Sequence, residues 1–168
     1  DLECRLCSAW PAGLTSVRSA VWLTGGAREA VHLLKYQGWW RVAESLAEPM
    51  KGLEPLTGQV SLIPIPLGYN QSERIARAIA ARTGLAVRSG VLSRVRETPT
   101  QTALTPEARH ANVAGAFRAT GAAGLRCVLV DDVFTTGATL AQAGAALAAA
   151  GAATVEAVTF ARAPELVG

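Results

Sequence analysis

The hydrophobic and polar positions of the chain follow two spacings, and each spacing predicts a different kind of element. Short apolar runs rich in β-branched residues predict strands; they lie at residues 21–22, 60–65, 85–87, 128–130 and 154–160, and Phe117 enters a further strand. Apolar residues three and four positions apart predict helices; these lie at residues 27–35, 40–50, 71–83 and 140–150. Alternating strands and helices are typical of an α/β domain with a mainly parallel sheet and helices on both faces.

Capping residues and chain breakers predict where several of these elements end. Asn70 is the expected N-cap of the helix that Gly84 ends, with Glu73 as its capping-box partner. Gly151 is the expected terminator of the last helix. The polar residues 93–103 predict a mobile loop that is suited to act as a lid over a site.

Residues 128–140 combine a strand, a loop and a helix start in one run. Asp131 and Asp132 follow the apolar strand directly, and carboxylates at the carboxyl end of a strand can accept hydrogen bonds from a sugar diol. The loop that comes next consists of Thr135, Thr136, Gly137, Ala138 and Thr139. Successive N–H groups at a helix start, with the positive end of the helix dipole, bind phosphate. The run therefore predicts a site for a ribose 5-phosphate unit.

Two well-known phosphate sites do not explain this run, because the chain contains neither G-x-x-x-x-G-K-[ST] nor G-x-G-x-x-G after a strand. The alternative is purely structural: the two aspartates form a solvated turn and the threonines cap the helix. That alternative leaves unexplained why both features follow a single buried strand.

Length, composition and charge limit the classes of protein that fit. A chain of 168 residues, half of them apolar, is long enough for one α/β core, and no uncharged run is long enough to predict a membrane span. Without a signal peptide the expected compartment is the cytoplasm, and the start at Asp1 indicates that the N-terminus of the gene product lies upstream.

The charge of the chain is unevenly distributed: residues 70–118 hold eight arginines against three acids. This basic segment predicts a phosphorylated ligand or a nucleic-acid backbone, with a solvated helix face as the alternative.

The cysteines do not form a disulfide framework. Cys4 and Cys7 form a C-x-x-C pair, which is half of a tetrahedral zinc site, so a structural Zn²⁺ requires a second pair. Cys127 begins a buried strand and is expected to fill the core.

The run at 128–140 resembles the phosphoribosyl pyrophosphate signature of type I phosphoribosyltransferases. The whole chain resembles the ComF family, phosphoribosyltransferase-like proteins associated with DNA uptake in naturally competent bacteria. The blocks that carry this second resemblance occur in order: Cys4 and Cys7, residues 34–38, 64–66 and 69–71, Arg94, Arg96, Thr98, Gln101, Leu104, Arg109, Asn112, residues 115–117 and residues 128–140. The resemblance implies a type I phosphoribosyltransferase-like fold. Residues 1–58 would form an N-terminal cover with a partial zinc-finger-like C-x-x-C, and residues 59–168 the core.

Two features depart from the family pattern. Family members usually carry four zinc-binding cysteines, and only Cys4 and Cys7 are present here. Members also carry a longer, arginine-rich loop between the positions of Pro66 and Tyr69, which would face pyrophosphate, whereas here residues 67–68 join the strand directly to the helix. We expect the gene product to contain the longer loop.

The resemblance implies transfer of phosphoribose from phosphoribosyl pyrophosphate to a nitrogen acceptor that the sequence does not identify. Asp131 and Asp132 would be the catalytic and ribose-binding acids, and residues 135–139 would hold the 5-phosphate. Mg²⁺ would arrive with the diphosphate, with an aspartate in support. The expected pyrophosphate or lid contacts are Lys35, Tyr36, Arg74, Arg94, Arg96 and Gln101. For Lys35 the alternative is an ordinary solvated lysine.

Two functions of other classes compete with phosphoribosyl transfer. A competence factor would bind single-stranded DNA through the basic segment and through Trp39 and Trp40, beside a competence helicase. Packing in the cover is the alternative role of the two tryptophans. A sensor would bind the ribose phosphate without turnover. We expect His32 and His110 to be surface or packing residues rather than acid–base groups.

Overall fold

The computed structural model describes residues 13–36, 41–66, 71–96 and 115–164. Its central sheet has five strands in the order β1-β7-β6-β2-β3, and every neighbouring pair is parallel. The strands are β1 (Ser16–Trp22), β2 (Ser61–Pro64), β3 (Ala86–Val87), β6 (Arg126–Phe134) and β7 (Thr154–Arg162). The helices are α1 (Gly25–Tyr36), α2 (Val42–Met50), α3 (Gln71–Thr83) and α5 (Ala138–Ala149), with a short 3-10 helix η1 (Glu54–Leu56). A separate antiparallel pair consists of β4 (Leu92–Arg94) and β5 (Phe117–Ala119).

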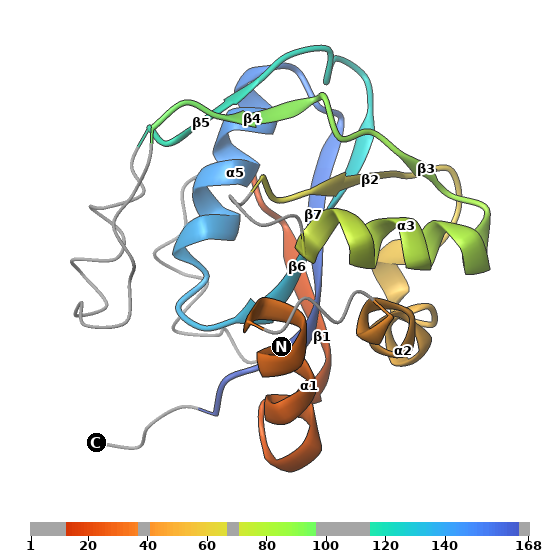
Figure 1. The fold of residues 1–168 in the computed structure, drawn as a ribbon. Coiled ribbons are helices and arrows are strands. Elements are labelled where there is room, and N and C mark those ends of the chain that lie inside the picture. The colour runs from red at the N-terminus through yellow and green to blue at the C-terminus, as the bar shows by residue number, and fades with distance from the viewer. Residues whose placement is uncertain (1–12, 37–40, 67–70, 97–114, 165–168) are drawn as a thin grey trace, which may run out of the picture.

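Helices cover both faces of the central sheet (Figure 1). Successive side chains of a strand point to opposite faces, so β6 contributes to two apolar clusters. Val128 and Val130 pack in the cluster that contains residues of α1, α2 and α3. Cys127 and Leu129 pack in the cluster that contains residues of α5 and the β4-β5 pair. A strand buried on both faces needs a continuous apolar run. The predicted α/β class with a mainly parallel sheet is confirmed.

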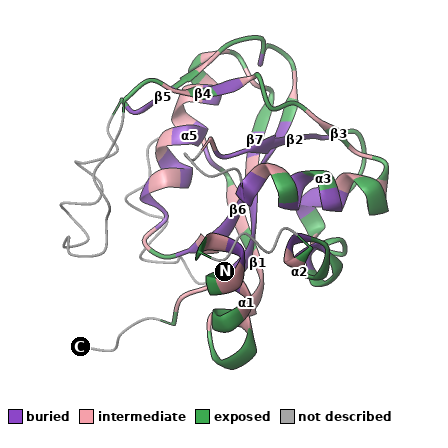
Figure 2. Ribbon diagram, in the orientation of Figure 1, coloured by how far each residue is buried: buried purple, intermediate pink, exposed green. Residues whose placement is uncertain are grey.

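Helix α5 packs closely because its residues are small. A Cβ built on Gly144 would lie 2.9 Å from the Cβ of Leu14, so a larger side chain here would push the helix away from the sheet. One face of α5 is buried (Figure 2), and four of its six buried residues are alanine or glycine: Ala138, Ala141, Ala143 and Gly144. The close approach holds the middle of α5 against the segment that leads into β1.

The structure extends several predicted elements. The strand predicted at 21–22 begins at Ser16 and pairs along its length with β7, so the N-terminal segment supplies an edge strand to the central sheet. The strand predicted at 128–130 continues to Phe134, because β7 pairs with it throughout. Asp131 and Asp132 therefore lie within β6 rather than after it. Helix α5 begins at Ala138, before the predicted Leu140.

One loop prediction is wrong in part. Ser93 and Arg94 were expected in a polar loop but belong to β4, because the antiparallel pairing with β5 overrides their weak strand propensity. The remaining lid residues, 97–103, lie outside the described residues, as does Asn70, so the lid and the capping box stay predictions. The boundary between the N-terminal cover and the core also stays a prediction. In the parts of the chain that the structure describes, no helix has the length and apolar character needed to cross a bilayer.

Candidate functional site

The two aspartates lie where β6 outlasts its neighbour β2. The β2-β6 pairing ends at Pro64 opposite Val130, and Ile65 donates one more hydrogen bond to the Val130 carbonyl at 3.1 Å. Beyond that point β6 continues to pair with β7 as far as Phe134. Asp131 and Asp132 occupy this end of the strand, and both are buried, with exposed fractions of 6% and 2%. The site is thus at the carboxyl edge of a parallel sheet, where α/β proteins bind ligands.

Asp131 is held by two hydrogen bonds to one oxygen. The Ser72 hydroxyl and the backbone N–H of Asp132 each donate to Asp131 Oδ1 at 2.9 Å. Burial raises the pKa of the Asp131 carboxyl to about 7, and the adjacent Asp132 charge adds to the rise. The two hydrogen bonds and the nearby Lys35 act in the opposite direction but do not offset the burial. Asp131 is therefore poised to gain or lose a proton near neutral pH.

Asp132 is paired with a cation from the N-terminal part of the chain. Lys35 Nζ, in the last turn of α1, lies 2.9 Å from Asp132 Oδ2. The Asp132 side chain is 3% exposed and the Lys35 side chain 32%. Burial lowers the pKa of the Lys35 ammonium, but the attraction and hydrogen bond of Asp132, with smaller contributions from Asp131 and Tyr36, together outweigh burial, so the pKa is raised overall. Lys35 is therefore a charged partner of the site rather than an ordinary solvated lysine.

The loop between β6 and α5 forms the start of a helix whose N-cap residue, Gly137, has no side chain that could cap it. Gly137, at the N-cap, has φ +77°, a left-handed conformation that favours glycine. The Ala138 N–H donates one long hydrogen bond, 3.5 Å, to Thr136 Oγ1, which is a weak contact that a ligand oxygen can replace. A hollow of about 30 Å³ over the loop is lined by Asp131 and residues 133–140. The N–H groups of this first turn are thus available to an anion.

Sequence reasoning missed a row of side chains beside the loop. The Arg162 guanidinium lies 5.3 Å from the centre of the Phe134 ring and 5.8 Å from that of Trp22. The three residues end β7, β6 and β1, which are neighbours in the sheet. Trp22 is 58% exposed. Its place at the end of an apolar strand could have indicated a position at the carboxyl edge.

Sequence reasoning also missed Ser72. It is fully buried in the first turn of α3, and its hydroxyl is a direct partner of Asp131. The only signal was its place at the start of the helix that follows the strand ending in Pro64, because that helix start must lie near the same edge of the sheet.

The remaining predicted contacts are distributed over three places. Lys35 lies at the acid pair, and its neighbour Tyr36 is 72% exposed, with its ring centre 4.9 Å from that of the exposed His32. Arg74 is exposed in the same helical turn as Ser72. The contacts shown for Arg94 are within the small sheet and its margin: its guanidinium lies 5.9 Å from the centre of the Phe117 ring, and its Nε donates to the Arg96 carbonyl at 3.3 Å.

Four other groups of predicted residues lie outside the described ones: Gln101, the zinc candidates Cys4 and Cys7, Trp39 with Trp40, and His110. Cys127 is buried in the core as expected, with an exposed fraction of 1%. Among the described residues, no group of three or more His, Cys, Asp or Glu side chains could hold a metal ion. The zinc and magnesium expectations stay predictions.

The basic segment does not present all its arginines to a ligand. Arg77 pairs with Glu73 at 2.6 Å, and Arg82 pairs with Glu48 at 3.2 Å. Part of the positive charge of residues 70–118 is therefore neutralised within the protein.

Comparison with known proteins gives a consistent result. Residues 69–167 match the phosphoribosyl transferase domain family. The chain is 33% identical to "DNA utilization protein YhgH" of Salmonella typhi over 143 residues, which cover 75% of this chain and 63% of that protein. It is 41% identical to the protein of the same name in Salmonella typhimurium over 90 residues, which cover 53% of this chain and 40% of that protein. The chain thus spans less than two thirds of the length of these relatives.

Proposed function

The chain belongs to the phosphoribosyl transferase domain family, and from this premise we propose that it binds phosphoribosyl pyrophosphate at the carboxyl edge of its sheet. The observation that carries the proposal is the first turn of α5, which among the described residues only a long hydrogen bond to Thr136 caps and which follows two buried aspartates by one short loop. The turn offers N–H groups and a left-handed Gly137 to the 5-phosphate. Asp131 and Asp132 offer carboxylate oxygens to the ribose hydroxyls.

The proposed reaction transfers phosphoribose to a nitrogen acceptor. The bond between ribose C1 and the diphosphate oxygen breaks, and the diphosphate leaves with the electron pair. The acceptor nitrogen supplies the pair for the new C1–N bond and loses its proton to water. The ribose carries positive charge in the transition state, so the buried carboxylates nearby stabilise it. Lys35, beside Asp132, offers its positive charge to the departing diphosphate.

Mg²⁺ fits this site only as a partner of the ligand. Carboxylate oxygens are suitable donors for Mg²⁺. However, the described residues supply two neighbouring aspartates and no third His, Cys, Asp or Glu side chain, and Asp132 is already paired with Lys35. Asp131 or Asp132 would support an ion held mainly by diphosphate, ribose hydroxyls and water. When bound, Mg²⁺ would neutralise charge on the diphosphate.

Calorimetry with phosphoribosyl pyrophosphate and Mg²⁺ tests the binding proposal. Asp131→Ala should weaken affinity by about tenfold or more, because a carboxylate that accepts hydrogen bonds from the ribose is lost. Glu156→Ala is the matched control, since it removes a β7 carboxylate that lies opposite Val128, away from the loop. Equal affinity of Asp131→Ala and the parent protein would overturn the site assignment. Release of pyrophosphate in the presence of nucleobases would separate a transferase from a ribose-phosphate sensor.

We further propose a role in DNA uptake or use, which the printed name of the Salmonella relatives supports. Arg74 and Arg96, which are exposed in the basic segment, are the proposed contacts to single-stranded DNA, and a helicase is the proposed partner. Fluorescence anisotropy with labelled oligothymidylate at increasing salt tests this. Phosphate contacts release counterions, so affinity should fall steeply with salt. Binding that is absent, or that does not depend on salt, would contradict this role.

A further inference from the structure

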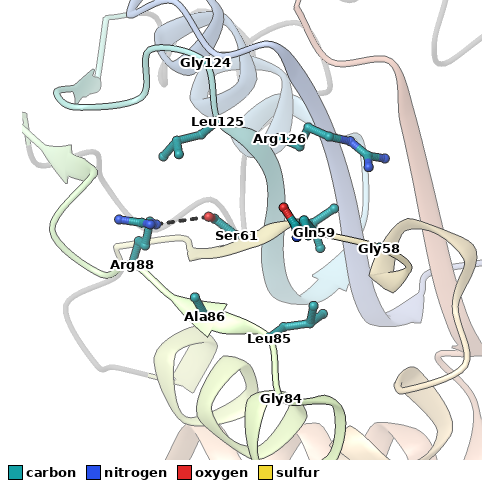
Figure 3. Close-up of a pocket in the computed structure, with 11 residues that line it drawn as sticks. Gly58, Gln59, Ser61, Gly84, Leu85, Ala86, Arg88, Gly124, Leu125 and Arg126 are labelled. Atoms are coloured by element: carbon teal, nitrogen blue, oxygen red, sulfur yellow. Dashed lines mark hydrogen bonds between the residues drawn. The ribbon is translucent and has the colours of Figure 1, made fainter.

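A second hollow lies at the opposite edge of the central sheet, where the strands begin. Parallel pairing brings the first residues of β2, β3 and β6 together at this edge. The loops before them, at Gly58, Gly84 and Gly124, form the walls of the hollow (Figure 3). Its volume is about 810 Å³, which is in the usual range for pockets that take small molecules. It shares no lining residue with the hollow over residues 133–140.

Each of the three loops has a glycine where the chain bends to enter its strand, and a glycine places no side chain in the hollow. Gly58, Gly84 and Gly124 have φ values of +72°, +74° and +72°. A Cβ at Gly84 or Gly124 would meet no atom within 4 Å, so the turn itself, and not crowding, favours glycine there. No side chain from these three positions fills the space above the strand starts.

The charged side chains of this hollow are all positive. Arg88, just after β3, and Arg126, at the start of β6, flank Ser61 and Gln59 (Figure 3). None of the described residues that line the hollow is acidic. Without a neighbouring carboxylate, such cations favour an anionic ligand.

The two arginines remain available for a ligand. Arg88 Nε donates to the Ser61 hydroxyl at 3.1 Å, which orients the guanidinium and leaves its terminal N–H groups free of any described partner. Arg126 is exposed and forms no ion pair within the described parts of the chain. By contrast, Arg77 and Arg82 pair with glutamates of the protein.

We propose that this hollow is a second binding site, which takes the phosphate group of a small phosphorylated molecule of nucleoside monophosphate size. Guanidinium groups bind phosphate oxygens in a planar, bidentate geometry, and the hydroxyl of Ser61 and the amide of Gln59 add polar partners. Walls on three sides and two cations suit a compact ligand, whereas a nucleic-acid strand needs a groove that follows its backbone. The inference goes beyond the proposed function, since it uses neither Asp131 nor residues 135–139.

Amide NMR spectra can report on the two sites separately. Adenosine 5′-monophosphate is the probe, and adenosine is the matched ligand without phosphate. The monophosphate should shift the amide signals of Gly58, Gly84 and Gly124 in a saturable way, and adenosine should not. A shift of the Gly137 amide signal reports that the monophosphate occupies the loop at the carboxyl edge. Absence of binding at one site can therefore be distinguished from absence of binding at the other.

The double variant Arg88→Gln/Arg126→Gln tests the role of the cations. It should weaken the monophosphate response of the three glycines by about tenfold or more, because charge-assisted hydrogen bonds are lost. The Gly137 response should persist. Arg118→Gln is the control, since it removes one exposed charge from β5 and should change neither response. Circular dichroism melting of each variant verifies that the fold is intact.

Three results would overturn the proposal. The glycine signals could fail to respond to the monophosphate, respond equally to adenosine, or respond equally in the double variant. Shifts that appear only with a twelve-residue oligothymidylate would also overturn it, and would assign this surface to nucleic acid instead.

Discussion

At the carboxyl edge of the sheet the two aspartates are buried and bond to other side chains, whereas at the amino edge the two arginines are exposed and no described residue that lines their hollow is acidic. Asp132 lies 2.9 Å from Lys35, and Asp131 accepts two hydrogen bonds. Arg88 and Arg126 flank an open hollow at the other edge. Both edges have glycine turns and groups that can bind a phosphorylated ligand, but these groups are buried at the carboxyl edge and exposed at the amino edge.

The difference teaches how one sheet can present two kinds of binding surface. Buried groups at the carboxyl edge are fixed in place, and removing one member leaves its partner uncompensated at high cost. Exposed arginines at the amino edge are solvated before a ligand arrives, so losing one affects binding much more than folding. Changes at the first edge should therefore alter stability and binding together.

The largest effect is expected from breaking the buried ion pair. Lys35→Met should lower the free energy of unfolding by about 2–4 kcal/mol, because Asp132 stays buried without its cation. Urea denaturation measures the change. The double variant Lys35→Met/Asp132→Asn should recover much of the loss. Lys51→Met, which removes the cation from the exposed Lys51–Glu48 pair, is the control and should change stability little. If Lys35→Met and Lys51→Met lower the free energy of unfolding by the same amount, burial of the ion pair does not distinguish the carboxyl edge from the exposed surface.

The second prediction concerns Asp131 and pH. The folded protein holds the Asp131 proton up to about pH 7, whereas the unfolded chain releases it near pH ~4. Between these values the folded state binds more protons, so stability from this group is present at low pH and is lost as the pH rises through about 7. Asp131→Asn has no proton to lose and keeps an oxygen that accepts from Ser72.

Asp131→Asn should therefore be more stable than the parent protein at pH 8, by on the order of 1–3 kcal/mol, with a difference that shrinks toward pH 5. Denaturation curves at a series of pH values measure it. A constant difference across that range would show that the Asp131 proton does not distinguish the folded from the unfolded state.

The third prediction compares one glycine from each edge. Gly137→Ala and Gly124→Ala both place a Cβ on a left-handed residue, with φ +77° and +72°, so each should cost about 1–2 kcal/mol of stability. Only Gly137→Ala should also weaken binding of phosphoribosyl pyrophosphate, because only that turn presents the first N–H groups of α5. Melting curves and calorimetry separate the two effects. If Gly137→Ala and Gly124→Ala weaken the affinity for phosphoribosyl pyrophosphate equally, the ligand does not distinguish the carboxyl edge from the amino edge.

The fold and its family were largely predictable from the sequence. The periodicity predicted every strand of the central sheet and each described α-helix, and the resemblance to ComF-like type I phosphoribosyltransferases is confirmed by the family match and the relatives. The missed elements were the short helix η1 and β4, whose Ser93 and Arg94 form a strand only because β5 pairs with them. Similarly, Asp131 and Asp132 lie within β6 because β7 extends the ladder past the end of β2.

The sequence by itself determined the strand, loop and helix of residues 126–149, because the aspartates, Gly137 and the first turn of α5 are joined by short-range chain geometry. Only the tertiary structure decided the partners of those aspartates. Lys35 and Ser72 come from helices that are distant in sequence, and they reach the site because the helices pack beside the end of β6. The hollow at the amino edge is likewise a product of packing, since its three loops meet only when their strands pair.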